Sequence, residues 1–295
     1  MSSQHVGDAV TVRFFLPSPA LAPYISTYYL TEVRGPADTT VQDWLHPEWA
    51  NVRFARNPRW QAAIGSDALR EPPTVIGTGP TCQAAHFLIG PARIWGIGVL
   101  PLGWARLCSG DAALHADRFT DARAEPAYAA FAPLLDTAFT DEPDPAAEAA
   151  RIDAHLLAEL ARRPPSEDEA RIRAAHAALL DHEVGSVGEL AERLSLSPRS
   201  LERLSLKAFG FSPKLLLRRQ RFLRSLAQFM LDPSLTWIRT LDWQYVDQAH
   251  FVRDFKRFMG MSPSTYAQLD HPVLRAAARA RAAAAGAAVQ ALHRP

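Results

Sequence analysis

Short apolar runs, separated by turn residues, fill the first 120 residues of the chain. The runs that are rich in β-branched or aromatic residues lie at 10–16, 24–30, 51–54, 74–76 and 93–100. Proline and glycine punctuate them, for example at Pro17, Pro23 and Gly35. This pattern is typical of strands, and a long series favours an antiparallel barrel or sandwich. From residue 124 to residue 160 the apolar positions recur at helical spacing, so we expect helices beside the strands.

Beyond Pro164 and Pro165 the pattern becomes helical throughout. Ser186 and Glu189 fit a capping box, which predicts a helix from residue 187 to about 193. A serine followed by a proline begins each of the next two helices, at about 198–209 and 213–231. Gly210 separates these two helices, because glycine ends helices readily. An all-α region is therefore expected after the strands.

These patterns predict an α+β chain of two domains. A β-rich, barrel-like (cupin-like) domain with flanking helices is expected over residues 10–160, and a linker over 161–168. An all-α domain is expected over residues 169–270, followed by an Ala/Arg-rich tail, either a frayed helix or disordered, over 271–295. A length of 295 residues suits two such domains.

An internal repeat is the most informative feature of the sequence. Leu201-Glu202-Arg203 and Phe251-Val252-Arg253 stand at the same distance before Gly210-Phe211-Ser212-Pro213 and Gly260-Met261-Ser262-Pro263, with an offset of 50. Each copy predicts a capped helix, a tight turn and a further helix, as in a helix-turn-helix unit. The long helix between the copies, about 27 Å for 18 residues, would hold two such units about one DNA turn apart.

The residues of the repeat resemble the signature of AraC/XylS-type transcription regulators. The resemblance is carried by residues 247–266, DQAHFVRDFKRFMGMSPSTY, and by residues 190–201, LAERLSLSPRSL. More loosely, residues 12–160 resemble the β-rich sensor-like domain of some of these regulators, and residues 45–48 and 94–103 carry this resemblance. The resemblance implies sequence-specific binding of double-stranded DNA and regulation of transcription. It makes RNA polymerase, a small-molecule effector at the N-terminal domain and a second copy of the chain candidate partners.

Ten residues are candidates for DNA contact. In the first copy they are Arg199, Ser200, Arg203 and Lys207, and in the second copy Gln248, Ala249, His250, Arg253, Lys256 and Arg257. Arginine pairs bidentately with guanine, and glutamine pairs with adenine, so Arg199 and Gln248 are candidates for base contact. Arg203, Arg253, Lys256 and Arg257 suit phosphates, to which at least half of protein–DNA hydrogen bonds go.

Charge is distributed unevenly along the chain. Residues 1–165 carry 13 Lys and Arg against 18 Asp and Glu, whereas residues 196–260 carry 12 against five. A local cationic excess of this size predicts a phosphate-binding surface.

Other classes of function find little support in the sequence. His46, Glu48 and His86 are residue types that could bind a metal in the barrel, but their spacing in the sequence matches no known ligand set. Cys82 and Cys108 lack neighbours that would activate a thiol. We therefore expect no catalytic residues, no metal and no cofactor. The sequence has no long apolar segment and no secretion signal at its start, so a cytoplasmic protein without membrane contact is expected.

Two alternatives stay open. Three departures from the family pattern, at Ser205, Arg239 and Gln244, allow a protein-interaction module that keeps the fold without reading bases. A barrel enzyme fused to a DNA-binding domain is the second alternative.

Overall fold

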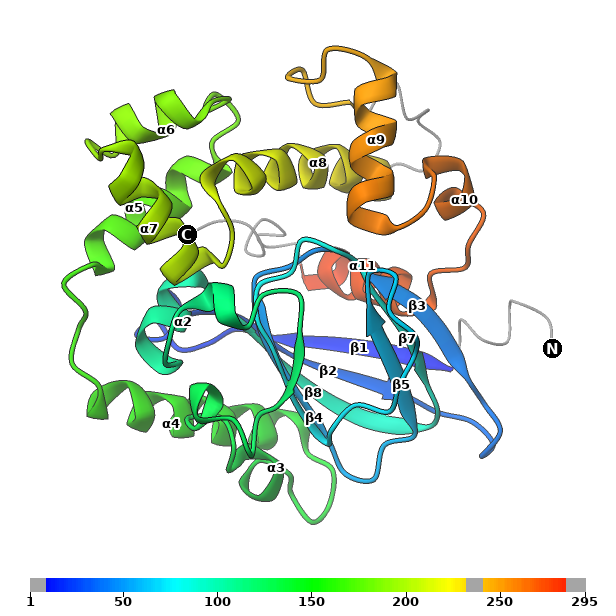
Figure 1. Ribbon diagram of the computed structural model, residues 1–295. Coiled ribbons are helices and arrows are strands. Elements are labelled where there is room, and N and C mark those ends of the chain that lie inside the picture. Colours follow the sequence, from blue (N-terminus) through cyan, green and yellow to red (C-terminus); the bar gives the residue numbers. More distant parts are fainter. Residues whose placement is uncertain (1–8, 232–240, 285–295) are drawn as a thin grey trace.

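The computed structural model describes residues 9–231 and 241–284 (Figure 1). Its N-terminal part is built on a six-stranded antiparallel sheet with the order β1-β2-β8-β4-β6-β9. The strands are β1 (Val10–Phe15), β2 (Ile25–Val33), β4 (Ala50–Ala55), β6 (Val75–Thr78), β8 (Ala92–Val99) and β9 (Phe119–Asp121). All five runs that the sequence marked as strands lie in this sheet, which confirms the expectation of an antiparallel β-rich region.

A smaller antiparallel sheet was not expected from the sequence. It contains β3 (Val41–Leu45), β7 (Ala85–Ile89) and β5 (Trp60–Ile64), in the order β3-β7-β5. The apolar alternation of β3 is broken by Asp43, which is fully buried. Alanine, which has low β propensity, occupies two of the five positions of β5. Both features make β3 and β5 hard to recognise in the sequence. In the structure, pairing with β7 stabilises both strands.

The two faces of the large sheet pack against different partners. In β8, Trp95, Ile97 and Val99 join the main hydrophobic core with the flanking helices, whereas Ile94 belongs to a second cluster between the sheets. This division follows from the alternation of side chains along a strand. The second cluster includes Val41 and Ile89 of the small sheet, so the two sheets enclose an apolar interior.

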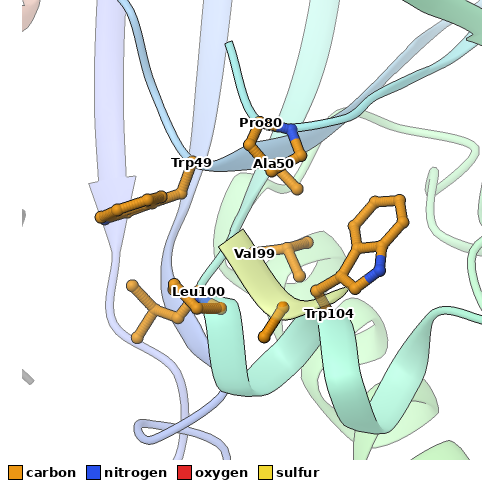
Figure 2. A pocket seen from close by; sticks show the side chains of 8 residues that line it. Trp49, Ala50, Pro80, Val99, Leu100 and Trp104 are labelled. Atoms are coloured by element: carbon orange, nitrogen blue, oxygen red, sulfur yellow. The ribbon is translucent and has the colours of Figure 1, made fainter. Parts of the chain in front are cut away.

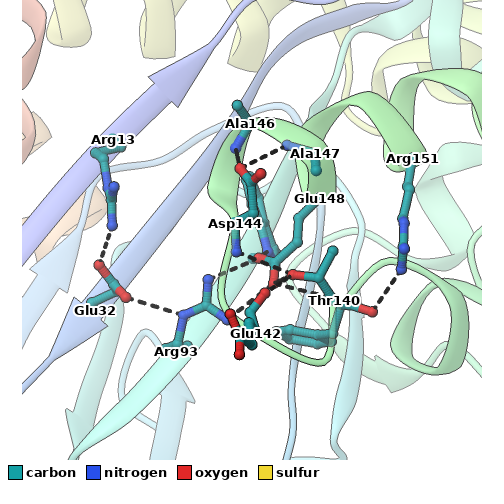
Figure 3. A network of polar contacts seen from close by, with 12 residues as sticks. Arg13, Glu32, Arg93, Thr140, Glu142, Asp144, Ala146, Ala147, Glu148 and Arg151 are labelled. Atoms are coloured by element: carbon teal, nitrogen blue, oxygen red, sulfur yellow. Dashed lines mark hydrogen bonds and ion pairs between the residues drawn. The ribbon is translucent and has the colours of Figure 1, made fainter.

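Helices cover the other face of the large sheet. They are α2 (Pro101–Leu107), α3 (Leu134–Thr137) and α4 (Pro145–Arg162), with short 3-10 turns at Ala112–Leu114 and Pro126–Tyr128. A buried ion network ties α4 to the sheet (Figure 3). Arg93 of β8 donates to both oxygens of Glu148 at 3.1 and 2.8 Å and to Glu32 of β2 at 3.0 Å. Trp95 Nε1 also donates to Glu148, at 2.8 Å.

The C-terminal part is helical, as the sequence predicts. Its helices are α5 (Glu169–Leu180), α6 (Val187–Arg193), α7 (Pro198–Phe209), α8 (Pro213–Leu231), α9 (Gln248–Met259), α10 (Pro263–Ala267) and α11 (Pro272–Ala284). In Figure 1, α8 runs between α7 and α9. Within 9–231 and 241–284, no helix combines the length and the apolar character that crossing a membrane requires.

The final helix is better ordered than the sequence led us to expect. Its residues 272–284 fall in the tail for which the sequence predicts either a frayed helix or disorder, and α11 is a helix that packs against β1 and β3. Val273 and Ala277 are buried in the cluster between the sheets. The sequence of α11 gives little indication that the helix packs against strands. Packing on these apolar strands stabilises the helix, because packing usually outweighs intrinsic propensity.

Candidate nucleic-acid interface

The first helix-turn-helix unit consists of α6 and α7. Ser186 and Glu189 form the capping box at the start of α6, and the Ser197 hydroxyl accepts a hydrogen bond from the Ser200 amide at the start of α7. The turn between the helices passes through Ser195, whose φ of 51° lies in the left-handed region. Leu201, fully buried, anchors α7 to the core. Because Leu201 faces the core, the residues on the opposite side of α7 face solvent.

That opposite face carries residues at helical spacing. Arg199, Arg203, Leu206 and Lys207 are exposed and lie at positions i, i+4, i+7 and i+8 of α7. Lys207 also forms an ion pair with Asp168 at 3.1 Å, ahead of α5. The exposed stripe thus carries three cations, of which Lys207 is also bound to the fold, and one acid, Glu202, which is exposed beside Arg203.

The second unit presents a matching helix. The Asp247 carboxylate caps α9 by accepting a hydrogen bond from the His250 amide at 2.6 Å, and Gly260 ends the helix in the left-handed region at φ 73°. Phe251, Phe255 and Phe258 are fully buried against Phe222 of α8. The segment that would supply the first helix of this unit, residues 232–240, lies outside the described residues, as does Arg239.

Exposed cations line the outer face of α9. Ala249, Arg253, Lys256 and Arg257 are exposed at positions i, i+4, i+7 and i+8. They match the four exposed positions 199, 203, 206 and 207 of α7 shifted by 50, whereas the exposed Glu202 corresponds to the half-buried Val252. The repeat in sequence is thus also a repeat in exposure at these four positions. None of the three cations forms a salt bridge with another residue of the described ranges. Gln248, at the first position of α9, is exposed as well.

His250 differs from the other candidates. Its ring packs edge-on against Tyr245, with centroids 5.2 Å apart, and its Nε2 lies 3.2 Å from an Arg221 nitrogen. The side chain is therefore partly engaged within the domain.

Four of the five cations of α8, all but the exposed Lys214, have structural partners, so the whole charge excess does not form one DNA-binding surface. Arg218 and Arg221 both form ion pairs with Asp254, whose side chain is fully buried. Arg224 forms an ion pair with Asp242. Cations whose charge is matched by a buried carboxylate contribute less to phosphate binding than free ones. The cationic surface is accordingly narrower than the composition of residues 196–260 indicates.

The sequence analysis gave Asp254 no role, although its position in the sequence indicates one. It lies three residues after Phe251 and one before Phe255, within the apolar face of an amphipathic helix. An acidic residue there needs a buried partner, because burying an unpaired charge is costly. Besides the two arginines, the Tyr245 hydroxyl donates to it at 3.0 Å.

Gln244 and Ser205, which depart from the family pattern, both have a place in the packed structure. Gln244 Nε2 donates to the His182 carbonyl oxygen at 2.7 Å, and Arg224 donates to its Oε1 at 3.4 Å. Gln244 thus links the end of α5 to α8. Ser205 is buried at 3% exposure inside α7.

Arg219 of α8 joins the helical part to the β-rich part. It is buried at 1% exposure, donates to the carbonyl oxygens of Glu48 and Thr81 at 3.2 and 2.8 Å, and lies over the Trp49 ring at 3.9 Å. Burial lowers the pKa of Arg219 to about 10. Cation–π contact and two carbonyl acceptors offset part of the cost of burying this charge.

The junction beside α7 is closely packed. Trp49, Pro80, Val99 and Trp104 lie around a small space (Figure 2), and Ala208 of α7 also lines it. This space has no room for a water molecule. The first unit therefore rests directly on the β-rich part.

The second unit also contacts the β-rich part. The Ala84 amide donates to the carbonyl oxygen of Phe258, at the end of α9, at 2.7 Å. His46 Nε2 lies 2.6 Å from the Tyr266 hydroxyl of α10. Both helix-turn-helix units are therefore attached to the same β-rich part.

The residues that suggested a metal site have other partners. His46 contacts Tyr266, Glu48 pairs with Arg53, and His86 stacks on Trp44 with centroids 4.5 Å apart. Across the part of the chain that the structure describes, no group of three His, Cys, Asp or Glu residues could hold a metal ion.

The two cysteines lie in the β-rich part, where Cys82 is buried and Cys108 is half-buried. Burial raises the pKa of the Cys82 thiol to about 12, assisted by its hydrogen bond to Asp117 at 3.0 Å. Burial also raises the pKa of Cys108. Thiols of this kind are poor nucleophiles near neutral pH.

Comparison with known proteins gives one family and several distant structures. Residues 190–268 match the family described as helix-turn-helix domain, and this stretch spans α7 to α10. A sequence search of the curated proteins found no match.

The solved structures are similar only at low identity. ToxT from Vibrio cholerae has 11% identity and a TM-score of 0.42, over 78% of this chain and 97% of its own. ToxT with a bound unsaturated fatty acid has 9% identity and a TM-score of 0.40, over 80% and 97%. The AraC-like transcriptional activator CuxR has 16% identity and a TM-score of 0.22, over 76% and 89%.

Proposed function

We infer that the protein is a DNA-binding transcription regulator of the AraC type, and we propose that α7 and α9 are its recognition helices. The observation that carries this proposal is the match between the two exposed faces. Positions 199, 203, 206 and 207 of α7 and positions 249, 253, 256 and 257 of α9 are exposed alike, at the offset of the sequence repeat.

The spacing of the two helices suits neighbouring segments of one duplex. They are connected by α8, whose 19 residues span about 28 Å at 1.5 Å per residue. One turn of B-DNA is about 34 Å long, so one monomer can place two helices in successive major grooves. The ion pairs of Asp254 with Arg218 and Arg221 fix α9 on α8 and hold this spacing.

The proposed contacts divide into base readers and phosphate anchors. We assign Arg199, Ser200, Gln248 and Ala249, at the starts of the two helices, to base edges, because the N-terminal residues of a recognition helix reach deepest into the groove. We assign Arg203, Lys207, Arg253, Lys256 and Arg257 to phosphates. His250, which is partly engaged by Tyr245 and Arg221, is assigned to positioning and to contact at the edge of the groove. The mechanism is non-catalytic and requires no metal or cofactor.

Selection from a library of random duplexes tests this function. The full-length protein should enrich one motif with two conserved segments about one helical turn apart. The variant R203A/R253A removes one cation from each exposed face and should weaken enrichment strongly, whereas R171A/R173A, with two exposed cations of α5 removed, should enrich the same motif. Enrichment of no motif by the wild-type protein would favour the alternative of an interaction module that does not read bases.

Other partners belong to the same proposal. A small-molecule effector at the β-rich part, RNA polymerase and a second copy of the chain are the candidates, in the cytoplasm. The contacts of Arg219 with Glu48 and Thr81 offer a route from the β-rich part to α8. Sedimentation of the protein with and without its selected DNA site, followed by addition of RNA polymerase, tests the two macromolecular partners.

A further inference from the structure

Val246 has an exposure that the fold does not explain. It stands one residue before Asp247, the N-cap of α9, and its side chain is 88% exposed, more than Leu16, Leu114 or Trp243. A valine at this place displays apolar surface at the beginning of a helix that we assign to the major groove.

The ordinary structural role of an apolar residue at this position is absent. A hydrophobic residue before the N-cap commonly packs against the fourth residue of the helix, as a hydrophobic staple. In α9 the fourth residue is Phe251, which is fully buried and packs against Tyr245 and Phe255 with centroids 5.4 and 5.7 Å apart. A side chain that is 88% exposed does not take part in this packing.

The first unit provides an internal comparison. Leu196 stands 50 residues before Val246 and precedes the N-cap Ser197 of α7. Leu196 is partly buried and packs against the main core, which also contains Leu201, the fourth residue of α7. The same repeat position is therefore structural in the first unit and projects into solvent in the second.

We propose that Val246 contacts the C5-methyl group of a thymine and gives the second unit a preference for thymine at one position of its site. This inference rests on the proposed function. The thymine methyl is the apolar group that the major groove presents, and small apolar side chains recognise it. Ala249, the next exposed apolar residue of α9, lies on the same N-terminal turn.

The surroundings of Val246 favour DNA as the occupant. Three exposed cations, Arg253, Lys256 and Arg257, follow on α9 and suit the phosphates beside a groove. The nearest acid in sequence, Asp247, directs its carboxylate to the His250 amide at the helix start. An apolar residue beside a cationic stripe complements a methyl group beside phosphates.

Substitution of thymine by deoxyuridine tests the proposal, because it removes only the C5-methyl group. Binding of the full-length protein to its selected duplex is measured by fluorescence anisotropy, with each thymine replaced in turn. The wild-type protein should lose about fourfold in affinity at one thymine of the segment bound by the second unit, which is the value of one buried methyl group. V246A should bind the unmodified duplex more weakly by a similar factor and should be insensitive to that replacement.

The matched control is L196A, at the equivalent position of the first unit. It should lower the melting temperature of the protein and keep the wild-type response to deoxyuridine. The proposal is overturned if no replacement weakens the wild-type protein, or if V246A responds to the replacement as the wild type does. Failure of the proposed function is distinguishable, because the wild-type protein would then select no duplex at all.

Discussion

The Nδ1 atom of His271 lies 2.9 Å from a carboxylate oxygen of Asp43, a residue 228 positions earlier in the chain. The other carboxylate oxygen accepts hydrogen bonds from the amides of Val273 and Leu274 at 2.9 and 3.0 Å. Asp43 of β3 thus caps α11 from outside, and Asp43 itself is fully buried. Since α11 follows directly on α10, this contact ties the end of the DNA-binding region to the β-rich part.

Replacement of Asp43 should therefore destabilise the whole chain. D43A leaves the two amides and the His271 ring without their buried acceptor, and an unsatisfied buried group costs about 1–3 kcal/mol. The free energy of unfolding from urea denaturation measures the effect. The control is D38A, which removes an exposed carboxylate ahead of β3. Equal stability of the two variants would contradict the capping role of Asp43.

Asp254, the acidic residue of α9, should be required for the stability of the helical part. D254A leaves Arg218 and Arg221 without their common buried partner, and breaking a buried ion pair on one side typically costs about 3–5 kcal/mol. Thermal unfolding should show a large decrease in melting temperature. D270A, which removes an exposed partner of Arg275, should have little effect. If D254A unfolds at the wild-type temperature, the ion pairs of Asp254 with Arg218 and Arg221 do not stabilise the packing of α9 on α8.

Acid should weaken the protein partly through Glu148. Burial alone would raise the pKa of Glu148, but the hydrogen bonds from Arg93, Trp95 and the Thr140 amide outweigh it and lower that pKa below 4.5. A lowered pKa in the folded state contributes stability above the ordinary pKa, and this stability is lost as the pH falls.

The variant E148Q isolates this contribution. The wild-type free energy of unfolding should fall more steeply than that of E148Q between about pH 5 and about pH 3. At neutral pH, E148Q should be the less stable protein, because Arg93 loses one of its two carboxylate partners and keeps only Glu32. Parallel pH curves for the two proteins would exclude the ionised Glu148 as the source of the acid sensitivity.

On the proposed assignment, base reading by the first unit should depend on Arg199. R199A should weaken binding to the selected site by roughly 1–3 kcal/mol and relax the preference at one base pair. Competition binding with single-base variants of the site measures both effects. R173A removes an exposed cation of α5 and should leave affinity and preference unchanged. Unchanged binding by R199A would refute the role assigned to Arg199.

Salt dependence separates the free cations from the paired ones. The logarithm of the association constant should fall by about 0.9 per phosphate contact for each log unit of salt. K256A and R257A should each lower this slope by about 1. R224A should leave the slope nearly unchanged, because Arg224 is paired with Asp242. A flat salt dependence of the wild-type protein would be inconsistent with phosphate anchoring.

Local chemistry made much of the helical part predictable. The boundaries of α6, α7 and α8 follow from serine caps, from prolines in the first turn and from Gly210, whose φ of 82° suits a residue without a side chain. Such signals act over a few residues and are legible in one sequence. The repeat at an offset of 50 likewise indicated which positions of α7 and α9 would be exposed.

Contacts between distant residues could not be read in the same way. The small sheet was missed because β3 places Asp43 inward, where its partner is His271 near the other end of the chain. The cations of α8 looked alike in sequence, yet Arg219 is buried on Trp49 while Arg218 and Arg221 hold Asp254. Charge in a sequence gives the number of cations, and only the packing of the elements decides which of them meet a buried acid and which face solvent. The sequence by itself thus determined two similar capped helices and their cationic character, whereas the tertiary structure decided which cations stay available to DNA, because ion pairing depends on proximity in space.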